Sequence, residues 1–226
     1  MANAQAVGGR AAGGIGAGEQ EDCLQGDLVV RHSLLVRLTH WWVAVFFILA
    51  FLSGAALYSP RFFSLTNLFG GGYATRQLHP WFSVLFTLGL VPLFLRWANQ
   101  MAWTAADTNW INNFKRYIRY EEISDVGKFN AGQKLFFWAA VLGGLVLLLS
   151  GVVIWFPTSF PLWLRYLSYP LHEILFILFG IAIIYHIYIT LFALGGTLRA
   201  MTRGTVTKNW ASSHHPRWYD EVRRKG

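Results

Sequence analysis

Four long stretches without a charged residue constrain the fold of this chain more than any other feature of its sequence. They are 23 residues between Arg37 and Arg61, 19 between Arg76 and Arg96, 30 between Lys134 and Arg165, and 25 between Glu173 and Arg199. A helix of about 20 apolar residues crosses a hydrocarbon core about 30 Å thick. We therefore predict an all-α membrane protein, a four-helix transmembrane bundle with helices at 35–58, 78–96, 134–156 and 171–196.

The composition agrees with a membrane protein. Hydrophobic residues make up 54% of the chain and charged residues 13%, against about 25% charged in an average soluble domain. The single cysteine, Cys23, excludes an internal disulfide and a cysteine-ligated iron–sulfur cluster. The net charge of +8 is explained by basic loops that face the cytoplasm. We therefore expect no nucleic-acid partner.

The distribution of basic residues predicts the direction of the helices. Four spans place both termini and the loop 97–133 on one side, and 16 of the 19 Arg and Lys residues lie there. The positive-inside rule makes this side cytoplasmic, which predicts a multi-pass membrane protein with both termini in the cytoplasm. We divide the chain into a disordered, Gly/Ala-rich arm (1–30), the transmembrane domain (31–200) and a cytoplasmic C-terminal tail (201–226).

Four histidines lie within these spans or at their edges: His40, His79, His172 and His186. An imidazole inside a bilayer is costly and usually functional. His172 and His186 are fourteen residues apart on one helix, so they return to within about 40° of the same face and lie about 21 Å apart along the axis. The topology then pairs His79 with His172 near the outer surface, and His40 with His186 near the inner surface. Two such pairs can hold two haems stacked across the membrane.

Two further features of the spans concern their ends. Pro80 suits a first helical turn, which predicts that His79 lies at the outer start of its helix. The sequences LSGAALYSP (52–60) and LSGVVIWFP (149–157) form a faint repeat. Its Ser-Gly pairs are compatible either with ordinary small-residue helix packing or with the close approach of a flat cofactor.

Several polar residues near the span ends have more than one interpretation. Arg37 and Arg76 lie about one turn before His40 and His79, where they would pair with haem propionates or face lipid headgroups. Three histidines outside the spans are interpreted as interfacial or subunit contacts, namely His32, His214 and His215.

The cytoplasmic loop carries a candidate quinone site. The stretch 110–122 mixes aromatic and basic residues and predicts an amphipathic helix on the inner surface. Asn130 can cap the helix that follows, and Gly132, Gln133 and Lys134 then fall in its first turn. Exposed N–H groups, an amide and the positive end of a helix suit a quinone oxygen that gains negative charge.

Several segments together resemble one family. They are RLTHWW around His40, LHPWF around His79, DVGKFNAGQK (125–134), SGVVIWFP (150–157), the spacing of His172 and His186, and GTVTKNWASSHHPRWY (204–219). Over residues 33–220 the chain resembles the gamma subunit, a di-haem cytochrome b, of membrane-bound respiratory formate dehydrogenases. The loop and tail motifs carry this resemblance more specifically than the histidines do.

The resemblance implies an electron-transfer and quinone-reducing subunit with two b haems, one at His79 and His172 and the other at His40 and His186. It implies an iron–sulfur beta subunit on the outer face, and beyond it a molybdenum- or tungsten-containing alpha subunit that oxidises formate. Menaquinone or ubiquinone would be reduced near the inner haem. The family's quinone site matches Asn130, Gly132 and Gln133.

Other functions remain open at this stage. The chain could anchor a hydrogenase or another quinone-linked oxidoreductase, or act as an independent cytochrome. It could also be a haem-free membrane anchor or a small transporter whose histidines serve protons or metals. Two features depart from the family pattern: the arm is long, and Glu173 stands beside an outer ligand, where it is either interfacial or involved in docking or proton uptake.

Overall fold

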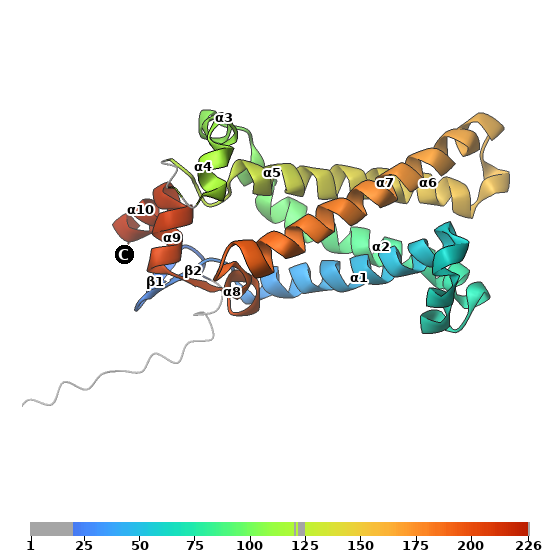
Figure 1. Ribbon diagram of the computed structural model, residues 1–226, viewed down its shortest axis with the longest axis horizontal. Helices are drawn as coiled ribbons and strands as arrows, with labels where there is room; N and C mark the ends of the chain where they lie inside the picture. Colours follow the sequence, from blue (N-terminus) through green and yellow to red (C-terminus); the bar gives the residue numbers. More distant parts are fainter. Residues whose placement is uncertain (1–19, 120, 122–124, 226) are drawn as a thin grey trace, which may run out of the picture.

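Four long helical rods run along the longest axis of the molecule (Figure 1). The computed structural model describes residues 20–119, 121 and 125–225. The rods are α1 (Leu34–Tyr58), α2 (Gly72–Trp97), the continuous run of α5 (Ala131–Trp138), π-helix η3 (Ala139–Gly143) and α6 (Gly144–Trp155), and α7 (Leu162–Tyr188) with π-helix η5 (Ile189–Ala193). Each rod is long and apolar enough to cross a membrane, so the prediction of four spans is confirmed.

Two of the rods begin earlier than predicted. Helix α2 starts six residues before position 78, and α7 starts nine residues before position 171. His79 therefore lies inside a helix, and the prediction that Pro80 places it at the helix start is wrong. The first turn of α2 is supported from outside, because Thr75 Oγ1 donates to the Gly71 carbonyl at 2.9 Å and Gly71 N–H donates to the Thr66 carbonyl. An uncharged run marks only the lipid-crossing part of a helix, whereas these helices continue beyond it.

The connections between rods are short at one end of the molecule and long at the other. At one end, the 3₁₀ helix η1 (Pro60–Phe69) joins α1 to α2 and the 3₁₀ helix η4 (Pro157–Ser159) joins α6 to α7. The opposite end holds both ends of the described chain together with α3 (Ala105–Asn112) and α4 (Phe114–Ile118) (Figure 1). The short 3₁₀ helix η2 (Ala98–Met101) leads from α2 into this region.

The chain ends fold together into a small unit, here called the terminal cap. It contains strands β1 (Cys23–Gln25), β2 (Leu28–Val30) and β3 (Thr205–Thr207), and helices α8 (Thr197–Thr202), α9 (Lys208–His214) and α10 (Pro216–Lys225). The strands form an antiparallel sheet in the order β1-β2-β3, in which Val29 lies opposite Val206. Both valines are buried with Trp210, Trp218 and Val222.

The terminal cap corrects the prediction of a disordered arm for residues 23–30, which form strands. The remainder of that prediction falls mainly on residues 1–19, which lie outside the described residues. The residues before α1 carry too few apolar side chains to form a core alone. A core forms only because they pair with a segment about 180 residues later in the chain. Local composition could not indicate this pairing.

The predicted amphipathic helix at 110–122 is also corrected. Two short helices, α3 and α4, occupy this region and are separated at Asn113, whose side-chain amide donates to the Asn109 carbonyl at 2.9 Å. Residues 120 and 122–124 lie outside the described part. Trp110 of α3 is buried together with Val126 and Ala131, so this helix packs on the start of α5.

Candidate functional site

The four intramembrane histidines lie in two facing pairs, one toward each end of the bundle. His79 of α2 faces His172 of α7, with ring centres 6.3 Å apart and ring planes at 80°. His40 of α1 faces His186 of α7 at the same 6.3 Å, with planes at 45°. These are the pairs expected from topology. The pair His79 and His172 lies toward the η1 end and is called the outer pair, and His40 with His186 is called the inner pair.

The spacing within each pair fits one metal ion between two imidazoles. A metal–imidazole nitrogen bond is about 2.0–2.1 Å, and a ring nitrogen lies about 1.1 Å from the centre of its ring, so two rings on opposite sides of one ion have centres about 6.4 Å apart. Both pairs match this value. Among the described residues, no three His, Cys, Asp or Glu side chains gather as a metal-binding group. The spacing of each pair would fit a group ligated by two imidazoles, such as a b haem.

Each histidine of the outer pair is held by a serine from the rod that precedes its own. Ser53 Oγ of α1 lies 3.0 Å from His79 Nδ1, and Ser150 Oγ of α6 lies 2.9 Å from His172 Nδ1. Orienting a metal-binding imidazole through its second nitrogen is typical of metal sites in proteins.

The glycine after each serine makes room for the same histidine ring. A Cβ atom at Gly54 would lie 3.1 Å from His79 Cε1, and one at Gly151 would lie 3.2 Å from His172 Cε1. Both distances are too short for an unstrained contact. The Ser-Gly repeat of the sequence therefore belongs to the outer pair, where it accommodates the imidazoles.

The inner pair has different neighbours. Phe136 of α5 stacks on His186 with ring centres 4.7 Å apart and planes at 10°, and Trp41 meets His40 edge-on at 5.4 Å. Within the described residues, His40 Nδ1 is buried without a hydrogen-bond partner. Phe136 lies three residues after Gln133, so both project from neighbouring positions on α5. This stacking brings the start of α5 close to the inner pair.

Aromatic rings fill the bundle between the two pairs. Phe47 of α1 stacks with Phe179 of α7 at 6.2 Å, and Phe51 stacks with Phe176 at 4.8 Å. In sequence, the two α7 phenylalanines lie between His172 and His186. Their packing provides an apolar interior between the sites.

The residues of the predicted quinone site form the start of α5. Asn130 Oδ1 accepts from Gln133 N–H at 2.9 Å, and Gln133 Oε1 accepts from Asn130 N–H at 3.0 Å, which is a capping box. These two backbone N–H groups are thus engaged, which corrects the expectation that they are exposed. Each side-chain amide keeps an NH₂ donor, because capping uses only its oxygen. Gly132 lies against Trp110, where a Cβ atom would be 3.2 Å from Cη2.

Lys134 is occupied by an ion pair that sequence reasoning missed. Its Nζ lies 2.7 Å from Asp107 Oδ2 and donates to the Ala102 carbonyl at 2.9 Å. The two charged side chains are only 6% and 4% exposed. Asp107 also caps α3 together with Thr104, and the spacing Thr-x-x-Asp was the one sequence signal that could have placed it. Lys134 therefore joins α5 to α3 instead of offering a free charge to a quinone.

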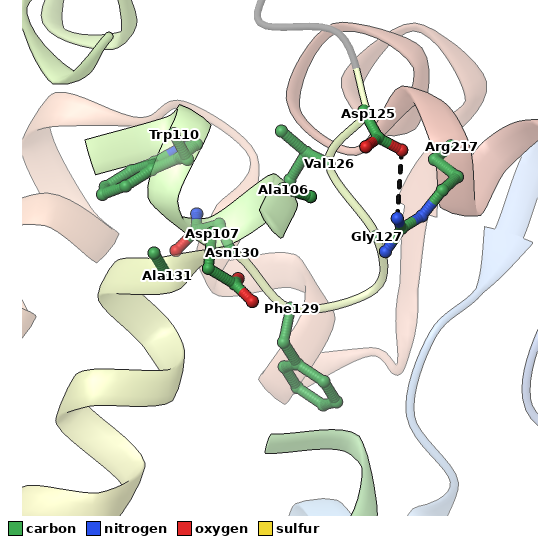
Figure 2. Close-up of a pocket in the computed structure, with 10 residues that line it drawn as sticks. All are labelled: Ala106, Asp107, Trp110, Asp125, Val126, Gly127, Phe129, Asn130, Ala131 and Arg217. Carbon is green, nitrogen blue, oxygen red and sulfur yellow. Dashed lines mark hydrogen bonds and ion pairs between the residues drawn. The ribbon is translucent and has the colours of Figure 1, made fainter. Parts of the chain in front are cut away.

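A small hollow lies beside Asn130 at the terminal-cap end of the bundle (Figure 2). Its volume of about 10 Å³ has room for about one water molecule. Figure 2 shows α3 with Asp107 and Trp110 on one side, and the Asp125–Arg217 ion pair on the other, with an N–O distance of 3.0 Å. The space is small, and its polar groups lie close to the α5 capping box.

The terminal cap holds the segment 125–130, which leads into α5. His215 Nδ1 donates to the Gly127 carbonyl at 2.7 Å, Trp218 N–H donates to the Val126 carbonyl, and Arg31 donates to the Lys128 carbonyl. Lys128 also pairs with Glu21 at 2.7 Å. These contacts come from both chain ends and position the peptide that carries Asn130.

Two histidines outside the spans lie where the prediction did not expect them. His215 and His32 are 1% and 3% exposed, so they belong to the core at the terminal-cap end of the bundle and are not interfacial. Arg37, in the first turn of α1, donates to the Thr202 carbonyl at 2.7 Å, which links α1 to α8. Its pairing with a haem propionate or a lipid headgroup stays a prediction.

Acidification is expected to loosen the terminal cap. Burial lowers the pKa of His215 well below its usual value of about 6.5, and the Arg31 guanidinium at 3.4 Å adds to this effect. Burial likewise lowers the pKa of His32. Below about pH 6.5 the two histidines bind protons in the unfolded cap but stay neutral in the folded cap. The free energy of unfolding of the cap therefore falls as the pH decreases, by up to about 1.4 kcal/mol per pH unit for each histidine. Hydrogen exchange of residues 125–130 at pH 7.5 and 5.5 measures this change.

A neutral replacement provides the control for this prediction. His215→Gln removes one titrating group, so the pH dependence of exchange should become shallower than in the unsubstituted protein. An unchanged pH dependence would assign the effect to other groups, such as His32 or His214.

Comparison with known proteins gives consistent matches over most of the chain. A family model described as prokaryotic cytochrome b561 matches residues 31–204. The cytochrome b556(fdo) subunit of formate dehydrogenase from Escherichia coli (strain K12) is 36% identical over 201 residues, which cover 88% of this chain and 95% of the relative. The cytochrome b556(Fdn) subunit of the nitrate-inducible formate dehydrogenase of the same strain is 35% identical, covering 87% and 93%. A formate dehydrogenase cytochrome b556 subunit of Haemophilus influenzae is 30% identical, covering 85% and 83%.

Proposed function

Because the chain belongs to the prokaryotic cytochrome b561 family, we propose that it is the cytochrome b membrane subunit of a formate dehydrogenase. In this role it passes electrons from an iron–sulfur subunit, across the membrane, to quinone. The observation that carries the proposal is the presence of two histidine pairs, each with ring centres 6.3 Å apart, at opposite ends of four apolar helices. The names of the relatives supply the formate dehydrogenase complex.

The residues of the two pairs would hold two b haems. His79 and His172 would be the ligands of the outer haem, and His40 and His186 those of the inner haem. Bound haem supplies one-electron chemistry, while the protein sets the ligands, the spacing and the dry surroundings. Helix α7 contributes one ligand to each pair, and its fourteen-residue spacing separates them by about 21 Å along the membrane normal.

The charges on the chain support an orientation of the bundle in the membrane. The end that carries both termini has most of the basic residues, so we place it in the cytoplasm of a bacterial inner membrane. The iron–sulfur beta subunit and the molybdenum- or tungsten-containing alpha subunit would then dock at the η1 end. Electrons move inward against an inside-negative potential, at a cost of about 2.3 kcal/mol per electron per 100 mV for a full crossing. The potential difference between donor and quinone must exceed this cost.

The start of α5 is the proposed quinone site. Phe136 stacks on the inner ligand His186, and Gln133 lies one turn before Phe136, with Asn130 at the N-cap of the same helix. Their NH₂ groups would donate to an oxygen of menaquinone or ubiquinone as it becomes negative, supported by the positive helix end. Protons for quinol would enter from the cytoplasm.

A haem spectrum of the purified protein tests the proposed function. Two b haems per chain are expected in a pyridine haemochrome assay. A protein without haem would instead support the membrane anchor or small transporter, and one haem per chain would contradict the two-pair assignment. The soluble subunits that co-purify distinguish a formate dehydrogenase from a hydrogenase anchor or from an independent cytochrome.

Replacing Asn130 or Gln133 by alanine is expected to slow quinol formation about 10- to 100-fold with both haem spectra intact. The reason is that a hydrogen bond to a charged group contributes about 1.5–3 kcal/mol. Rapid-mixing kinetics of haem reoxidation by quinone measure the effect. Thr207→Ala is the matched control, since Thr207 accepts from Trp210 N–H at 3.1 Å and caps α9 in the same way. If Thr207→Ala slowed quinol formation equally, the effect of Asn130 and Gln133 would be explained by helix capping alone.

A further inference from the structure

The serines beside the outer pair determine which nitrogen of each histidine carries a proton. Ser53 Oγ lies 2.7 Å from the Leu49 carbonyl, and Ser150 Oγ lies 2.7 Å from the Val146 carbonyl. A hydroxyl has one hydrogen, and in both cases it is directed to the carbonyl four residues earlier, which cannot donate. The serine oxygen is then an acceptor toward the histidine.

It follows that Nδ1 is the protonated nitrogen in both outer histidines. His79 Nδ1 meets the Ser53 oxygen at 3.0 Å and His172 Nδ1 meets the Ser150 oxygen at 2.9 Å. With an acceptor at Nδ1, the lone pair of each neutral imidazole is on Nε2.

In the inner pair, His40 lacks this arrangement among the described residues. His40 Nδ1 is buried without a hydrogen-bond partner, and the nearest ring neighbours of the pair are Trp41 and Phe136. A hydrogen bond from the second ring nitrogen makes an imidazole a stronger electron donor to the metal. Stronger donation favours ferric over ferrous iron and lowers the reduction potential. The two sites therefore differ in the property that sets the direction of electron transfer.

We propose that Ser53 and Ser150 are positioning residues that fix the Nδ1–H tautomer of the outer ligands and hold the outer haem at a lower reduction potential than the inner haem. This inference rests on the proposed function, because it requires haem between the paired histidines. Transfer from the outer to the inner site is then favourable within the protein and offsets part of the opposing membrane potential. The duplicated Ser-Gly sequence supplies one such serine to each outer ligand.

Redox titration of the purified complex carrying Ser53→Ala or Ser150→Ala tests the proposal. Loss of the hydrogen bond from one ligand should lower the preference of the site for ferric over ferrous iron about tenfold. Each tenfold loss in the preference for ferric iron raises a one-electron potential by about 59 mV, so the outer haem should shift upward by about this amount while the inner haem stays constant. The outer haem is identified as the one that is absent in His79→Ala.

Matched variants separate the hydroxyl from the shape of the side chain. Ser150→Thr keeps the hydroxyl and Ser150→Val has nearly the same shape without it, so only the valine variant should shift the potential. Thr87→Val is the control for loss of an ordinary intrahelical hydroxyl bond, since Thr87 Oγ1 donates to the Ser83 carbonyl at 2.9 Å, and it should shift neither haem.

Two results would overturn the inference. One is an unchanged outer potential in both alanine variants when two haems are bound, and the other is a shift confined to the inner haem. The proposed function fails separately, because that failure requires the unsubstituted protein to contain no haem.

Discussion

Replacing His79 or His172 by alanine is expected to remove one of the two haems and to stop electron transfer to quinone, while the second haem remains. Both residues belong to the outer pair, so loss of either leaves one imidazole and no second ligand within reach. The inner pair is formed by His40 of α1 and His186 of α7 and is unaffected by either change. The haem content should fall from two to one per chain, as measured by the haemochrome assay.

The complementary variants make this prediction selective. His40→Ala or His186→Ala should remove the other haem and leave the outer one, so the two classes of variant retain haems with different potentials. His214→Ala is the control, because His214 lies in the terminal cap next to Trp210 and should keep both haems. If His79→Ala and His186→Ala removed the same haem, the pairs would be crossed and the assignment would be wrong.

Replacing Asp107 by asparagine is expected to destabilise the packing of α3 on α5 by about 3–5 kcal/mol. The change leaves the Lys134 ammonium buried without its counter-charge, and removal of one partner of a buried ion pair typically has a cost of this size. In the unsubstituted protein, burial acts to raise the pKa of Asp107, but the bonds from Lys134 and Thr104 outweigh it and hold the pKa below its usual value. Thermal unfolding in detergent, with hydrogen exchange of α3 and α5, measures the loss.

A double variant distinguishes an unpaired charge from a general packing defect. Asp107→Asn combined with Lys134→Met removes both charges, so it should recover most of the lost stability. If the losses of stability in the two single variants simply added up in the double variant, the unpaired charge of Lys134 would not be the cause. The Asp125–Arg217 pair is the exposed comparison, with side chains 56% and 40% exposed, and Asp125→Asn should cost less than about 1 kcal/mol.

The structure also shows why the paired histidines and the residues that support them were not equally predictable. The histidine pairs followed from span direction alone, because a ligand cannot reach across most of the membrane. The supporting residues did not, because Ser53 and Ser150 resemble any small residue in a helix. Their role is visible only where two helices meet and the hydroxyl lies within 3.0 Å of the neighbouring ring.

The segment that leads to the proposed quinone site illustrates the same limit. Asn130 was predictable as a helix cap from its position before an apolar run. Its surroundings were not, since they come from Arg31 before the first span and from His215 and Trp218 after the last. The burial of Lys134 against Asp107 likewise depends on a contact between separate helices.

The sequence by itself determined the four spans and the pairing of the histidines. Both depend on one-dimensional properties, namely the length of an uncharged run and the position of a residue along a helix. Only the tertiary structure decided where α2 and α7 begin, how the chain ends form the terminal cap, and which hydroxyls and charges meet inside it. Those features arise from contacts between residues distant in the chain. No local segment contains the free energy of these contacts, and they outweigh local signals such as the preference of Pro80 for a first helical turn.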